Sequence, residues 1–256
     1  MLGTLCLAVY IPSSIADHWA GLLDRLRQTN VVNIDEVIDS QFPGESAARG
    51  FNVVDPYTSQ ASRVVLQWKA SSGPEAGVCA IRFNDSNKEA YDLRSFESLT
   101  VAVESGYIVT HRGRCGSCST LRDLAVYLGT PDLTTPARQC ARRFGLSRKK
   151  QCFEHSIGLT SQCAESWAYN ARHTRQECLG TCMADYGVLN LLFNRYPGAA
   201  VNDTGQLRPC LKCDEEESGP GFKYSAGRTR RNSGIESAIP RSRAEVYSVD
   251  HGSYFD

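Results

Sequence analysis

Apolar side chains follow two different spacings in the first third of the chain. From Ile15 to Gln28 they recur every three or four residues, which predicts an amphipathic helix. Arg63–Ala70 and Val78–Phe83 are short runs rich in β-branched and aromatic residues, the composition of strands. The intervening Ser71–Gly77 contains a Gly-Pro pair. These runs therefore predict an antiparallel hairpin closed by a turn.

The next segment alternates between helix and strand patterns. Ser95–Glu104 has helical spacing behind a serine that can cap it, and Tyr107–Thr110 is a short β-branched strand. The segment Cys115-Gly-Ser-Cys118 follows, and a helix is predicted over Ser119–Leu128. The two cysteines are therefore expected at a strand–helix junction.

The middle of the chain has the pattern of helices. One helix is predicted over Thr135–Phe144, with a proline in its first turn. Arg148–Asp185 predicts one long helix or two, with Gly158 and Gly180 as the candidate breaks. Met183–Phe193 is apolar, so we expect it to be buried.

These elements predict an α+β protein. A small antiparallel sheet would occupy the N-terminal half, and a disulfide-stapled helical part would form the C-terminal half. We expect one globular body over residues 14–214, of which 111–214 is the cysteine-rich helical part. Residues 215–256 would form an extended arm that either wraps the body or stays loose, because Glu215–Gly221 lacks a regular pattern and the rest is rich in Arg, Ser and Gly.

Charge and hydropathy exclude two classes of partner. Lys plus Arg and Asp plus Glu number 28 each, whereas a dedicated nucleic-acid binder normally carries a basic excess. No apolar run reaches the roughly 18 residues that span a bilayer.

The apolar segment Leu2–Ile11 has the length of a signal peptide and is followed by the small-x-small pattern of Ser14-Ile15-Ala16, but no basic residue precedes it. Residues 1–16 therefore read either as a signal peptide or as containing a first core strand.

The chain has eleven cysteines. With Cys6 set aside in the N-terminal segment, ten remain, and nine of them lie between residues 115 and 213. Such clustering indicates disulfides outside the cytosol, or metal or redox chemistry inside it. Sequons at Asn84 and Asn202 are typical of a secretory glycoprotein. We therefore expect a secreted protein or one of an organelle lumen.

Zinc is the alternative role for two of the cysteine pairs. Cys115-x-x-Cys118 and Cys210-x-x-Cys213 have the pair spacing of a four-cysteine zinc site. Ninety-one residues separate the two pairs, which is far for a structural zinc site. The expectation is no cofactor, with a zinc-stabilised intracellular protein as the alternative.

Cys115 and Cys118 are the candidate catalytic residues. A cysteine in the first turn of a helix meets free backbone N–H groups and the positive end of the helix dipole, which lower the pKa of its thiol. Cys118 would then resolve a mixed disulfide formed by Cys115. In a hydrolase or lyase, His111 would be the base for a Cys115 nucleophile. In a chain this rich in cysteine, both residues could instead be structural bridges.

The order strand, Cys115-Gly-Ser-Cys118, helix resembles the thioredoxin active site over about thirty residues. The resemblance implies an attacking role for Cys115 and a resolving role for Cys118. The sequence departs from that family at Arg114, where an aromatic residue is usual, and it has no well-placed proline to face the sulfurs.

Two helical cysteines have a spacing that suits cross-links between helices. Cys178 and Cys182 are four residues apart and share one helix face. We expect them to hold this helix to a neighbouring helix or to the segment of Cys210. Cys152 and Cys163 are eleven apart and could also share a face.

The segment from Gly227 to Gly234 is a candidate anion-binding loop. Its glycines permit a tight backbone, and its arginine forks suit a carboxylate, phosphate or sulfate. The alternative is a basic stretch that pairs with the acidic run at 215–217, or a processing site. The side chains proposed to bind the anion are those of Arg228, Arg230, Arg231, Asn232 and Ser233.

The functional hypothesis is a cysteine-rich enzyme with thiol chemistry at Cys115–Cys118 and an anion held by the arginine loop. Its partner would be a small anionic molecule or a protein thiol. A non-catalytic, disulfide-rich binding or structural protein is the alternative. The pattern does not indicate an oligomeric state.

Overall fold

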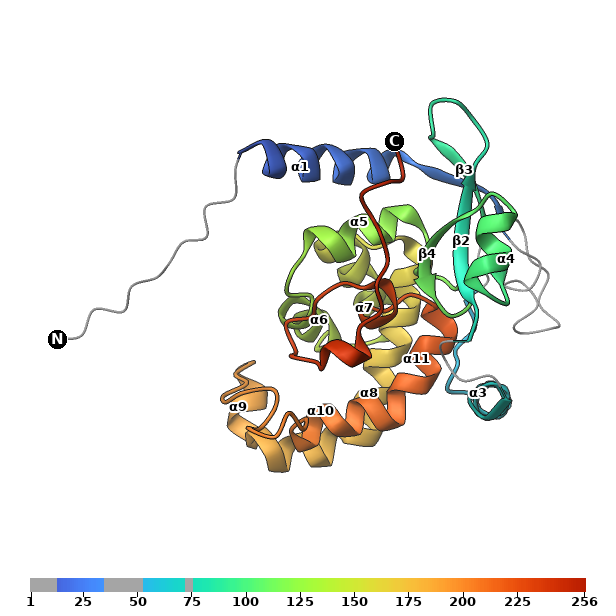
Figure 1. The fold of residues 1–256 in the computed structure, drawn as a ribbon. Helices are drawn as coiled ribbons and strands as arrows, with labels where there is room; N and C mark the ends of the chain where they lie inside the picture. Colours follow the sequence, from blue (N-terminus) through green and yellow to red (C-terminus); the bar gives the residue numbers. More distant parts are fainter. Residues whose placement is uncertain (1–12, 35–52, 72–75) are drawn as a thin grey trace.

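The computed structural model describes residues 13–34, 53–71 and 76–256 (Figure 1). The expected signal segment Leu2–Ile11 and Cys6 lie outside the described residues. Helix α1 (Ser13–Gln28) confirms the first expected helix, and it buries Leu22 and Leu26.

Four strands form one mixed sheet in the order β1-β3-β2-β4. They are β1 (Asn30–Ile34), β2 (Val78–Phe83), β3 (Ala90–Phe96) and β4 (Ile108–Arg112). β2 pairs antiparallel with β3 and with β4, whereas β1 adds to the edge of β3 in parallel. The expected sheet is thus confirmed in size and place, but it is not purely antiparallel.

The central strand β2 is covered on both faces. Cys79 and Ile81 face the main core with α1 and with α5 (Leu121–Gly129). Val78 and Ala80 face α4 (Leu99–Glu104). This is why the strand is a continuous apolar run without alternation.

The expected strand Arg63–Ala70 is wrong, because this segment lies in helix α3 (Ser59–Ser71). Ala61 and Val65, four residues apart, are both buried, and Trp68 one turn on packs edge-to-face against Tyr224 at 5.2 Å. Leu66 points outward and is 62% exposed. The helical spacing of the buried positions outweighs the strand preference of the valines. The hairpin consists of β2 and β3 instead.

The helical half follows the expected order closely. It comprises α6 (Thr134–Ala141), α7 (Leu146–Cys152), a π-helical turn η1 (Phe153–Ile157) and α8 (Ser161–Tyr186). Gly158 has a left-handed φ of 90° and separates η1 from α8, as expected. Gly180 does not break α8, which continues for 26 residues. No described helix is long and apolar enough to cross a bilayer.

Two segments after α8 differ from expectation. α9 (Val188–Leu192) begins after Gly187, and its Val188, Leu189 and Leu192 side chains are exposed rather than buried. The run 215–221 is helical, because α10 (Pro209–Cys213), η2 (Asp214–Ser218) and α11 (Gly219–Ala226) follow one another along α8.

The extended arm begins at Gly227 and wraps the body (Figure 1, red). It contains two short 3-10 turns, η3 (Arg231–Ser233) and η4 (Arg243–Glu245). Arg228 and Tyr254 of the arm are fully buried. The arm is therefore part of the core.

Five disulfides hold the body together, which confirms a disulfide-stapled α+β protein. Cys178 and Cys182 both link α8 to α10, as expected from their shared face. Such a number of bridges is typical of secreted or lumenal proteins. The pairs are Cys79–Cys115, Cys118–Cys163, Cys140–Cys152, Cys178–Cys213 and Cys182–Cys210.

Candidate functional site

The segment Cys115-Gly-Ser-Cys118 lies between β4 and α5, as expected, but its sulfurs do not pair with each other. Cys115 is bridged to Cys79 on the central strand, and Cys118 to Cys163 on α8. Both cysteines are 0% exposed. The segment is also not the first turn of α5, because Thr120 caps that helix by accepting a hydrogen bond from the amide of Asp123. The expected pairing of an attacking and a resolving thiol is thus corrected to two separate structural bridges.

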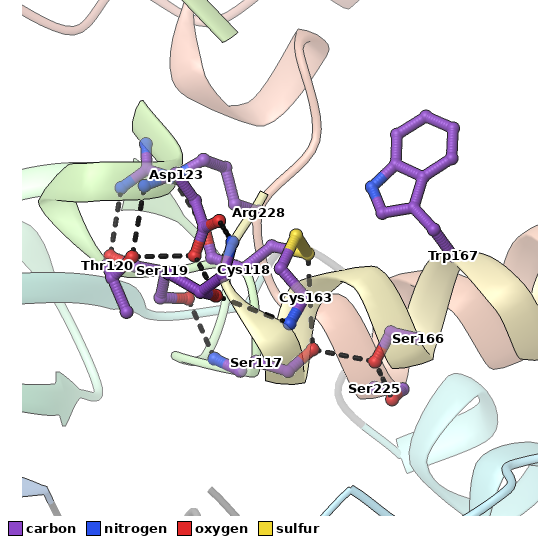
Figure 2. The surroundings of a disulfide bond; sticks show 12 residues. Ser117, Cys118, Ser119, Thr120, Asp123, Cys163, Ser166, Trp167, Ser225 and Arg228 are labelled. Atoms are coloured by element: carbon purple, nitrogen blue, oxygen red, sulfur yellow. Dashed lines mark hydrogen bonds between the residues drawn. A yellow bond between two sulfur atoms is a disulfide. The ribbon is translucent and has the colours of Figure 1, made fainter. Parts of the chain in front are cut away.

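Polar side chains around the Cys118–Cys163 bridge form two hydrogen-bonded groups, one of three serines and one centred on Asp123 (Figure 2). The hydroxyl of Ser166 lies 2.6 Å from those of Ser117 and Ser225. Asp123 accepts hydrogen bonds from the hydroxyls of Thr120 and Thr160, which cap α5 and α8 respectively. One buried carboxylate thus joins the N-termini of two helices. Burial raises the pKa of Asp123.

His111 forms a hydrogen-bonded pair with a hydroxyl, but it lies in the interior. Its Nε2 is 2.7 Å from Oγ of Ser119, and its Nδ1 is 2.8 Å from the carbonyl oxygen of Arg112. The imidazole is 0% exposed, and burial together with nearby Arg228 lowers its pKa. His111 is therefore a neutral side chain that supports the junction, with no path to a substrate and no contact to a free thiol.

Arg228 of the expected anion loop is a structural cation. Its guanidinium donates to the carbonyl oxygens of Cys118, Thr110 and Ser119 at 3.0 to 3.1 Å, and to Oγ of Ser233. No described carboxylate lies within ion-pair distance of it. Four of its five N–H groups donate to these oxygens and the side chain is 0% exposed, so Arg228 is a buried structural residue.

The other loop residues divide into two groups. Asn232 and Ser233 are buried, and the amide of Asn232 donates to the carbonyl oxygens of Arg112 and Gly227. Arg230 and Arg231 instead reach the wall of a large cavity. The five predicted anion-binding residues therefore do not form one site. Arg228, Asn232 and Ser233 are buried, and Arg230 and Arg231 face the cavity.

The zinc alternative does not fit the cysteine pairing. All four cysteines of the two Cys-x-x-Cys pairs are in disulfides, and Cys210 and Cys213 are bridged to α8. Thiolate ligands are therefore lacking. The part of the chain that the structure describes holds no group of three or more His, Cys, Asp or Glu side chains arranged for a metal ion.

A cavity of about 740 Å³ lies between α6, α8, α9, α10 and the arm. Ligand pockets typically measure roughly 300–1,000 Å³. The Cys182–Cys210 bridge lies in its wall and fixes α8 to α10. The arm closes it on one side through Arg230, Ile239 and Arg241. The cavity therefore depends on elements that the disulfides and the arm hold in place.

Aromatic side chains form much of the cavity wall. Trp167 of α8 packs against Phe153 and Phe222, with ring centroids 5.6 and 5.0 Å apart. Tyr186 and Tyr196 pack edge-to-face at 5.1 Å. All five residues line the cavity. The cavity is thus suited to an apolar molecule with flat or branched parts.

Six arginines share the wall with a single carboxylate, Asp214. Arg231 and Arg241 are both paired with Glu215. The remaining four have no described carboxylate within ion-pair distance, so the wall is strongly positive. These four are Arg138, Arg142, Arg175 and Arg230.

Arg138 and Arg175 are the least occupied of these four. Arg142 and Arg230 donate to backbone carbonyl oxygens, whereas Arg138 and Arg175 have no hydrogen bond or ion pair with any described residue. The guanidinium carbon of Arg138 lies 4.0 Å from the ring centroid of Tyr196. That of Arg175 lies 5.4 Å from the ring of Phe144. Their donors are therefore available to a ligand in the cavity.

Asp214 accepts a hydrogen bond from the hydroxyl of Thr174, and both line the cavity. Its loss of hydration raises its pKa. A carboxyl that is more easily protonated offsets less of the arginine charge, so the wall becomes more positive at lower pH.

Arg138, Arg142 and Arg175 were not among the predicted site residues. One signal pointed to the first two: residues 133–153 contain six basic residues and no acidic one. The apolar run Met183–Phe193 was the second signal, because part of it lines the cavity.

Comparison with known proteins gives one match. Residues 146–249, less than half of the 256, match a family of unknown function, DUF8771. No curated protein and no solved structure matches the chain. The matched region includes α8, α9, α10 and the part of the arm that lines the cavity.

Proposed function

We propose that this is a binding protein of an oxidising compartment, secreted or lumenal, whose cavity holds a small molecule with an apolar body and an anionic group. This is the ligand-binding form of the non-catalytic alternative. Of the predicted anion-binding loop, Arg230 contributes to this cavity, together with Arg138, Arg142 and Arg175 from outside the loop.

The excess of unpaired arginine in the cavity carries this proposal. Arg138 and Arg230 are half-buried, where a cation needs an anion or acceptor near it, and Arg138 has no hydrogen bond or ion pair with any described residue. Arg142 and Arg175 are exposed and add positive charge to the wall. The aromatic wall favours an apolar body, and the guanidinium forks favour a carboxylate, sulfate or phosphate. An anionic amphiphile satisfies both.

The test is a fluorescence titration of the purified, oxidised protein with dansylundecanoate, an anionic probe with an apolar chain. The neutral methyl ester of the same probe is the matched control. We expect the anion to bind more tightly, roughly tenfold or more, since charge-assisted hydrogen bonds contribute about 1.5–3 kcal/mol.

Two variants separate the site from the general surface. Arg138→Gln and Arg175→Gln should each weaken binding of the anionic probe and leave the ester unchanged. Arg122→Gln, on an exposed position of α5, is the matched control and should bind like the unmodified protein. Equal affinity for anion and ester, or unchanged affinity in both cavity variants, would refute the proposal.

A further inference from the structure

Five large apolar side chains that are more than half exposed lie on α9, at its C-cap or just after α6. Most soluble monomers expose such residues singly, and contiguous groups mark contact surfaces. We call the following five residues the α9 patch. Their exposed fractions run from 59% to 74%, for Val188, Leu192, Phe193, Leu189 and Phe144 in increasing order.

The α9 patch comes from two segments that hydrogen bonds of Arg142 join. Phe144 follows α6, and the other four lie on α9 or at its C-cap. Arg142 donates to the carbonyl oxygen of Leu192 at 2.7 Å, which holds the end of α6 against α9. Phe144 and Val188 also line the same cavity.

Basic residues accompany the α9 patch, and acidic residues are missing from its two segments. Residues 133–153 contain six basic residues and no acidic one, and 186–202 contain one basic and no acidic residue. The guanidinium carbon of Arg195 lies 5.7 Å from the ring of Phe193, so charge and apolar surface are in contact. Arg175 has the same relation to Phe144.

We propose that the α9 patch docks this protein on the surface of an anionic lipid bilayer. Leucine, valine and phenylalanine side chains enter the boundary between headgroups and acyl chains, and arginines beside them contact anionic headgroups. The side of the cavity lined by Phe144, Val188 and Leu192 then faces the bilayer, since these residues belong to both surfaces. Docking does not require that the cavity be occupied, so this proposal can hold even if the proposed function fails.

The experiment is vesicle flotation of the oxidised full chain with phosphatidylcholine vesicles, with and without phosphatidylglycerol. We expect binding only to the anionic vesicles, and weaker binding at high salt. Leu189→Ser combined with Phe193→Ser should reduce binding roughly tenfold or more, because two apolar side chains no longer enter the bilayer. Arg195→Gln should reduce it about fivefold.

The controls use exposed residues away from the patch. Val101→Ser combined with Val103→Ser, on α4, matches the apolar pair, and Arg122→Gln matches the charge change. Neither should alter vesicle binding. None of the patch residues changed here lines the cavity, so binding of dansylundecanoate should stay unchanged and report a folded protein.

Three outcomes would overturn the membrane proposal. They are no binding to anionic vesicles, equal binding to neutral vesicles, and patch variants that bind like the unmodified protein. Sedimentation should also show that the protein does not self-associate. If the protein instead forms a dimer that the patch variants abolish, and does not bind vesicles, the patch is the contact surface for a second copy of the chain. Loss of probe binding with intact vesicle binding would instead count against the proposed function alone.

Discussion

Replacing Arg228 by methionine tests whether the arm is held by a buried cation. Methionine has a similar length but no donor, so the substitution leaves three carbonyl oxygens and the hydroxyl of Ser233 without their partner. The residue is 0% exposed, so water does not replace the guanidinium.

The expected loss follows from two opposing contributions. Four hydrogen bonds from a charged donor contribute roughly 6 kcal/mol at about 1.5 kcal/mol each. Removal of a buried charge recovers several kcal/mol of desolvation, on the order of 3 kcal/mol. We therefore expect Arg228→Met to lower the free energy of unfolding by about 3 kcal/mol, which corresponds to roughly 6–12 °C in Tm.

Urea unfolding of the oxidised protein, followed by circular dichroism, measures this loss. Arg228→Lys should be at least as destabilising as the methionine variant, because it keeps the charge but cannot reach four acceptors. Arg122→Met, at an exposed position, should change the free energy of unfolding by less than about 0.5 kcal/mol. A loss below about 1 kcal/mol for Arg228→Met would refute the reasoning that the guanidinium network holds the arm.

Three further predictions concern the arm and the bridges. Gly116→Ala should lower the free energy of unfolding by roughly 3 kcal/mol or more, because its Cβ would lie 2.6 Å from backbone atoms of Ser225, Ala226 and Gly227, where α11 meets the arm; Gly180→Ala, with nothing within 4 Å, should be neutral or slightly stabilising in the same urea assay. Burial, with nearby Arg228, lowers the pKa of His251 to about 4. Between about pH 6.5 and 4, His251 is therefore protonated in the unfolded chain but not in the folded chain. The free energy of unfolding falls as pH decreases through this range. His251→Gln should reduce this fall by about 1.4 kcal/mol per pH unit, and an unchanged pH dependence would exclude the linkage. Peptide mapping without reduction should recover the five pairs found here and no alkylated thiol among their ten cysteines; a Cys115–Cys118 peptide would contradict the structure.

The order of helices was predictable because apolar periodicity reflects local burial. The first helix, the helices of the middle part and the break at Gly158 all follow from spacing and glycine. Arg63–Ala70 was misread because its valines favour a strand, whereas its packing partner, Tyr224 on α11, lies far along the sequence. Local preference cannot identify such a partner.

The candidate site was less predictable because it depends on tertiary contacts. A two-residue spacing cannot tell whether Cys115 bonds to Cys118 or to Cys79, since that choice depends on which strand lies beside the segment. Met183–Phe193 was expected to be buried because apolar composition usually means core. Val188, Leu189 and Leu192 are instead exposed, and three α9 residues, Val188, Leu191 and Leu192, line the cavity.

The buried arm has a consequence for biosynthesis. Synthesis proceeds from the N-terminus, so all ten bridging cysteines, the last being Cys213, are made before Arg228 and Tyr254. The carbonyls of Ser225 and Ala226, which accept from Ser117 and Cys118, are also made after these cysteines. A pair that forms before the arm is in place can still be exchanged by a thiol–disulfide isomerase, whereas closure of the arm buries the sulfurs of Cys115 and Cys118 and ends that access.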